Sequence, residues 1–138
     1  MNRYRKLTAV VVALLSSSMA LSEQANAFDL NGAWAGDAGN CKQVFTRRGS
    51  QWAFSDNSDV YGSGFIVEGD KIIGKSGRCQ IKARKDNGTN INLIAACASD
   101  IMSQSMQFSL KEVDANTVTR VFPGMDGMDI QFSRCPAQ

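Results

Sequence analysis

The chain contains no histidine, and this absence excludes several kinds of active site. A Ser-His-Asp or Cys-His site needs an imidazole to accept and return a proton. Histidine is also the commonest metal ligand in proteins. We therefore expect no catalytic residue, no metal site and no cofactor, and the sequence favours a binding protein over an enzyme.

The chain also lacks a concentrated excess of one charge. It has 15 basic and 13 acidic residues. Three of the basic residues and one of the acidic residues lie within the first 27 residues. The remaining 111 residues therefore carry 12 charges of each sign. Nucleic-acid-binding proteins need a clustered basic excess, so we expect no nucleic-acid partner.

The apolar run near the N-terminus, Ala9 to Leu15, is too short to span a bilayer. Basic residues precede this run, and small residues ending in Ala25-Asn26-Ala27 follow it, which is the order typical of a secretory signal peptide. No cysteine stands at the cleavage point, so we expect no lipid anchor. The sequence predicts a bacterial signal peptide over residues 1–27 and one periplasmic or secreted domain over residues 28–138, without a membrane span.

No two of the four cysteines have the C-x-x-C spacing of a zinc site. An even number of cysteines in a small exported domain predicts disulfides. In the hairpin predicted around Gly88, Ala83 should lie opposite Leu93, Ile81 opposite Ala95 and Cys79 opposite Cys97. We therefore predict a Cys79–Cys97 disulfide, which leaves Cys41 with Cys135; four cysteines allow three pairings, and the sequence leaves the other two open.

Alternating apolar and polar residues predict short antiparallel strands along the whole domain, and no helix. Among these, Cys41 to Arg48 and Gln51 to Phe54 are expected as strands. In the strand expected from Met102 to Val113, one face should carry Met102, Met106, Phe108 and Leu110. Short loops and the advantage of having no open sheet edge favour an up-and-down meander of about eight strands closed into a small barrel. A two-sheet sandwich is the alternative.

The stretch from Phe28 to Gly36 is expected to be the first strand of the barrel. Its segment Leu30-Asn31-Gly32-Ala33-Trp34, with a cysteine shortly after at Cys41, resembles the G-x-W first strand of the calycin superfamily. That group includes lipocalins, avidins and small bacterial metalloprotease inhibitors. The resemblance implies a meandering barrel in which Trp34 closes one end.

In lipocalins a basic residue from the last strand often packs on this tryptophan. The resemblance implies such a role for Arg134, with Arg120 as the second candidate. The lipocalin T-D-Y triplet is absent from the chain, and the short domain favours the smaller barrels of the superfamily.

Four aromatic residues are the candidate ligand-binding set, because in a small barrel they either fill the interior or line one mouth. They are Trp52, Phe54, Tyr61 and Phe65. The first hypothesis is a non-enzymatic exported barrel that binds a small apolar ligand or an extracytoplasmic protein. The alternatives are a protease inhibitor that inserts Phe28 to Leu30 into a protease cleft, and a structural envelope module without a ligand.

Overall fold

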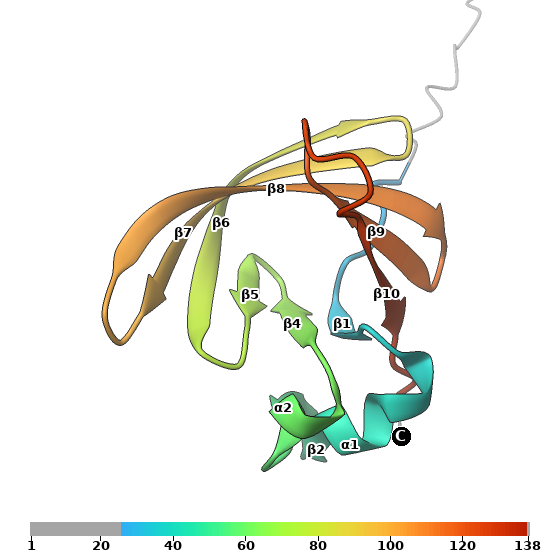
Figure 1. The fold of residues 1–138 in the computed structure, drawn as a ribbon, viewed down its shortest axis with the longest axis vertical. Helices are drawn as coiled ribbons and strands as arrows, with labels where there is room; N and C mark the ends of the chain where they lie inside the picture. The colour runs from blue at the N-terminus through green and yellow to red at the C-terminus, as the bar shows by residue number, and fades with distance from the viewer. Residues whose placement is uncertain (1–25, 138) are drawn as a thin grey trace, which may run out of the picture.

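The computed structural model describes residues 26–137, which form a closed antiparallel barrel of eight strands and a separate two-stranded sheet (Figure 1). Apart from its last two residues, the predicted signal peptide lies outside the described residues. The barrel strands are β1 (Gly32–Ala35), β4 (Gly64–Glu68), β5 (Lys71–Ile73), β6 (Gly77–Asn87), β7 (Asn90–Ser99), β8 (Ser103–Asp114), β9 (Thr117–Val121) and β10 (Ile130–Arg134).

The barrel is a meander. From β4 to β10, each strand pairs with the next one along the chain, and β1 closes the ring by pairing with both β4 and β10. The predicted up-and-down barrel is therefore confirmed over the sandwich alternative. Because successive strands run in opposite directions, the connections after β1, β5, β7 and β9 lie at one end of the barrel, and those after β4, β6 and β8 lie at the other.

Between β1 and β4 the chain leaves the barrel and forms an insertion over residues 36–63. Figure 1 shows it gathered below one end of the barrel, with the C-terminus beside it. Its elements are the single 3-10 turn η1 (Ala38–Asn40), α1 (Cys41–Val44), the hairpin strands β2 (Phe45–Arg48) and β3 (Gln51–Phe54), and α2 (Ser58–Tyr61).

The prediction that Cys41 to Arg48 is one strand and that the domain has no helix was wrong. Residues 41–44 form a single helical turn instead. Residues three apart lie on the same side of such a turn, so both Cys41 and Val44 are buried. In a strand they would point to opposite faces, and one of them would face solvent.

Residues 26–137 form two hydrophobic cores, one on each side of the β1–β4 wall. The inner core lies within the barrel and includes Trp34, Val67 and Phe132. The outer core lies between the barrel wall and the insertion and includes Ala33, Ile66 and Phe45. Strands β1 and β4 are therefore buried on both faces, because alternate residues feed different cores.

Gly64 allows the insertion to approach this wall closely. A Cβ atom at Gly64 would lie 2.6 Å from the Phe45 ring and 2.7 Å from the carbonyl oxygen of Trp34. No side chain fits at that distance, so the glycine lets the ring of Phe45 contact the β4 backbone.

The two predicted disulfides are confirmed. Cys79 lies directly opposite Cys97 in the β6–β7 ladder, and their sulfur atoms are bonded. Cys41, at the start of α1, is bonded to Cys135, which follows β10. The second bond therefore fastens the insertion to the last strand, and both fit an oxidising environment.

The predicted β6–β7 register holds at Ile81 opposite Ala95 but shifts beyond it, because a bulge lies between Ile81 and Ala83. After the bulge, Leu93 faces Arg84 instead of Ala83. Cross-strand partners share a face, so the bulge places Arg84, rather than the expected Ala83, on the side of the buried Leu93. There it bonds to the N-terminal segment, as described below.

We expect the two disulfides to contribute unequally to stability. Their sequence separations are 94 residues for Cys41–Cys135 and 18 for Cys79–Cys97. The chain-entropy relation gives about 5 kcal/mol for the longer loop and about 3 kcal/mol for the shorter one. Denaturant unfolding of the two double serine variants measures the difference. An equal or larger loss on removing Cys79–Cys97 would contradict the view that Cys41–Cys135 holds the insertion on the barrel.

Candidate functional site

One end of the barrel is closed by the N-terminal segment, residues 28–31, and by Trp34. Trp34 is fully buried, and its indole Nε1 donates a hydrogen bond to the carbonyl oxygen of Leu30 at 2.8 Å. Its ring packs between Phe28 and Phe65, each at a centroid distance of 6.2 Å. The segment before β1 therefore folds back onto Trp34 and covers one end of the inner core.

Arg134, at the end of β10, ties this segment down. Its guanidinium lies over the Trp34 ring, 4.3 Å from the centroid, and donates to the carbonyl oxygens of Asp29 and Asn31. Of the two arginines implied by the calycin resemblance, it is therefore Arg134 that contacts Trp34. Gly32, with φ +124°, lies beneath this guanidinium.

Arg84 holds the same segment from the opposite wall. Its Nη2 donates to the carbonyl oxygen of Phe28 at 2.7 Å, and its guanidinium forms a two-point ion pair with Asp86. Gly69 donates its backbone N–H to the side-chain oxygen of Asn31 at 2.7 Å. Residues 28–31 are thus bonded to the β4–β5 turn, to β6 and to β10, and form a fixed floor rather than a free arm.

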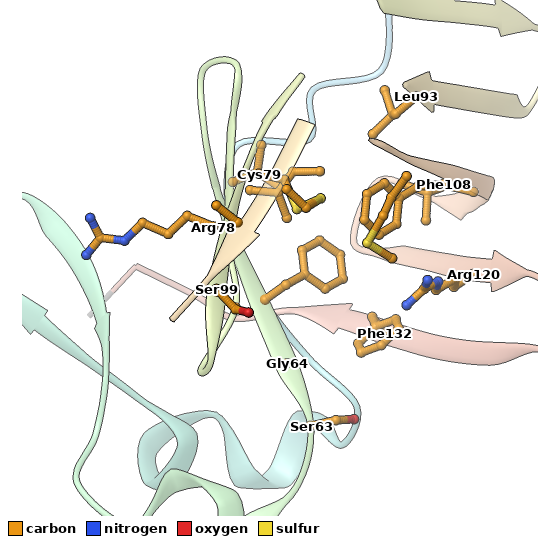
Figure 2. A pocket seen from close by; sticks show the side chains of 18 of the residues that line it. Ser63, Gly64, Arg78, Cys79, Leu93, Ser99, Phe108, Arg120 and Phe132 are labelled. Atoms are coloured by element: carbon orange, nitrogen blue, oxygen red, sulfur yellow. A yellow bond between two sulfur atoms is a disulfide. The ribbon is translucent and has the colours of Figure 1, made fainter. Parts of the chain in front are cut away.

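Next to this floor lies a cavity of about 500 Å³, lined mainly by residues of β4 to β10 and open at one end. Its walls are mainly apolar, and Figure 2 shows Phe108, Phe132 and Leu93 among the side chains around it. Leu30, of the N-terminal segment, belongs to the lining. The volume falls within the range of about 300–1,000 Å³ typical of small-molecule sites.

The cavity opens at the end of the barrel opposite the floor. Its lining there comes from the β5–β6 and β7–β8 connections, including Gly74, Ser99 and Met102. Apolar side chains are exposed in the connections at this end: Ile101 is 91% exposed, and Met102, Met125 and Met128 are more than half exposed. The mouth of the cavity is therefore bordered by apolar side chains.

Few polar side chains line the cavity. Ser63, Ser99 and Gln104 are neutral, and the charged ones are Arg78 and Arg120. Figure 2 shows Arg78 extending away from the other lining side chains, whereas Arg120 lies beside Phe108. Burial lowers the pKa of the Arg120 guanidinium from its ordinary value, because an apolar environment disfavours the charged form.

Of the four aromatic residues predicted to bind a ligand, only Phe65 lines the cavity. Trp52 and Phe54 pack on Phe45 in the outer core, at centroid distances of 6.2 and 5.1 Å. Tyr61 lies in α2 and is 48% exposed. The expectation assumed that β3 belongs to the barrel; β3 instead pairs only with β2, so its aromatic side chains face the outer wall.

The lining residues that the prediction missed come from the later strands. The alternation from Met102 to Val113 places Met106 and Phe108 on one apolar face but does not show that this face lines a cavity. Arg120 shares a face of β9 with Val118, and Phe122, just after the strand, continues the same alternation. A charged residue between two apolar residues on one face of a strand indicates a polar group inside the barrel, and this pattern could have identified Arg120 as a lining residue.

Comparisons of the chain with protein-family models, curated proteins and solved structures give no significant match. The eight-stranded closed barrel agrees with the architecture implied by the G-x-W resemblance. Within residues 26–137, no helix has the length and apolar character required to cross a membrane.

Replacing Arg134 by alanine should destabilise the barrel, because the N-terminal segment loses its bonds to β10 and Trp34 loses its stacked cation. Hydrogen bonds from a charged group contribute about 1.5–3 kcal/mol each at most, and we expect a total loss of about 2–4 kcal/mol in unfolding free energy. Urea unfolding followed by Trp fluorescence measures it.

Arg48→Ala is the matched control, because Arg48 ends β2 and is exposed. It should change the unfolding free energy by less than about 0.5 kcal/mol. Arg134→Lys keeps the charge without the planar fork and should recover only part of the loss. If Arg134→Ala behaved like Arg48→Ala, the floor would not depend on this side chain.

Proposed function

We propose that this protein is a non-enzymatic, exported calycin-like barrel that binds a small apolar ligand in its lumen, in the periplasm or outside the cell. The observation that carries the proposal is the apolar cavity of about 500 Å³ within the barrel. A small domain gains stability by filling its interior, so a lumen of this size favours a ligand site over a purely structural module.

The shape of the cavity also supports this function. The floor formed by residues 28–31 closes one end, and exposed Ile101 and Met102 stand at the mouth. Aromatic rings from three strands, Phe65, Phe108 and Phe132, line the space between. Such a site binds by burying apolar surface, and its open end gives a ligand a path of entry and exit.

The protease-inhibitor alternative needs Phe28 to Leu30 as a free arm. In this protein Leu30 is 4% exposed, and the carbonyl oxygen of Phe28 accepts a hydrogen bond from Arg84. Insertion into a protease cleft would require these contacts to break. The arrangement therefore favours the ligand-binding proposal over the inhibitor.

The test is the binding of N-phenyl-1-naphthylamine, a neutral apolar probe whose fluorescence increases out of water. We expect saturable binding of one probe per chain. Met106→Trp places a larger side chain in the lumen, because Met106 lines the cavity opposite the buried Ala95. This variant should weaken probe binding at least about tenfold, or about 1.4 kcal/mol.

Ser105→Trp is the matched control, because Ser105 is exposed and neighbours Met106 on the opposite face of β8. It should bind the probe within about twofold of the unaltered protein, a difference of less than about 0.5 kcal/mol. Thermal unfolding checks that both variants fold. Absence of saturable binding, or equal weakening by both tryptophans, would overturn the proposal.

A further inference from the structure

Of the two charged residues in the cavity lining, Arg120 is the one that lies against other lining side chains. It lies on β9 between Val118 and Phe122, and opposite Leu110 on β8 and Ile130 on β10. Val118 is fully buried, and Leu110 and Ile130 line the cavity together with Arg120. Arg120 is half-buried, so its guanidinium is partly withdrawn from water within an apolar site.

Among residues 26–137, no carboxylate forms an ion pair with this charge. The cavity lining contains no Asp or Glu. In the described part of the chain, the ion pairs join Lys75 to Asp59 and Arg84 to Asp86, and the Arg120 side chain forms neither an ion pair nor a hydrogen bond with the protein. Glu112 faces Val118 across the β8–β9 ladder but does not line the cavity.

The Arg120 guanidinium contacts two aromatic rings instead. It lies 5.0 Å from the ring centroid of Phe108 and 4.7 Å from that of Phe122. Cation–π contacts partly compensate the loss of water and leave the N–H donors of the guanidinium unused. An arginine keeps its charge at neutral pH even when its pKa is lowered. The lumen therefore presents a fixed cation with free donors in an apolar site.

We propose that the ligand is a monoanionic amphiphile, whose carboxylate pairs with Arg120 and whose apolar chain lies against Phe65, Phe108 and Phe132. This inference rests on the proposed ligand-binding function. A carboxylate matches the planar fork of a guanidinium with two parallel hydrogen bonds. We expect a single negative charge on the ligand, because only Arg120 would face it: Arg78, the other charged lining residue, is exposed and extends away from the cavity (Figure 2).

The experiment compares decanoate with 1-decanol, which have the same chain length and differ at the polar end. Each ligand displaces the neutral naphthylamine probe from the unaltered protein at pH 7.5. We expect decanoate to bind at least about tenfold more tightly than decanol. In Arg120→Met this preference should disappear while decanol affinity stays within about twofold, because methionine keeps the apolar stem without the charge.

Arg78→Met is the matched control and should keep the preference for decanoate. Arg120→Lys, which retains charge without the fork, should keep only part of it. Decyl sulfate, which also carries one negative charge at pH 7.5, tests the head group: tighter binding than decanoate would overturn the assignment of a carboxylate.

The possible failures are distinguishable. If neither the probe nor decanol binds, the proposed function itself fails. If both ligands bind equally well, or if Arg78→Met rather than Arg120→Met removes the preference, the lumen is a binding site but the role of Arg120 is overturned. Probe binding and thermal unfolding of Arg120→Met separate loss of the charge from loss of the fold.

Discussion

The barrel depends on closure through β1, a strand of only four residues that pairs with β4 on one side and β10 on the other. So short a strand offers few ladder hydrogen bonds, and an open seam would expose two strand edges. The seam is therefore strengthened by contacts outside the ladder. Arg134, at the end of β10, bonds to the segment before β1, and Cys135 donates its backbone N–H to Ala33 at 2.8 Å. Cys41–Cys135 adds a covalent link across the same region.

Much of this fold could be predicted from the sequence because its signals are local. The alternation of apolar and polar residues predicts the all-β antiparallel fold class. The cross-strand geometry around Gly88 predicts that Cys79 lies opposite Cys97. The bulge after Ile81 could not be predicted, since nothing in the alternation marks one extra residue. Its consequence is specific: it turns Arg84 toward the N-terminal segment, where the carbonyl oxygen of Phe28 accepts a hydrogen bond from it.

The candidate site was harder to predict than the fold, because a strand's apolar face does not reveal which core it joins. Trp52 and Phe54 have the same local pattern as Phe108, yet they pack in the outer core and Phe108 lines the lumen. The difference arises from the insertion over residues 36–63, which pairs β3 with β2 alone. Pairing between strands is a long-range property, and a single sequence read locally does not contain it. Arg120 is the exception, since its position between Val118 and Phe122 is itself a local signal.

The division into two cores explains how a domain of this size can leave space in its lumen. Empty apolar volume costs the surrounding side chains their packing partners, so a cavity of about 500 Å³ needs stability from elsewhere. Here the outer core buries Phe45 and Val44 against the outer face of β1 and β4. The N-terminal segment, residues 28–31, covers Trp34 at the closed end of the lumen. These contacts and the Cys41–Cys135 bond stabilise the fold from outside the cavity. Side chains such as Met106 and Phe108 can therefore line the cavity without filling it. The same separation allows Arg120 to lie half-buried in the lumen, although an apolar environment disfavours its charge, because the outer core and the disulfides stabilise the fold outside the cavity.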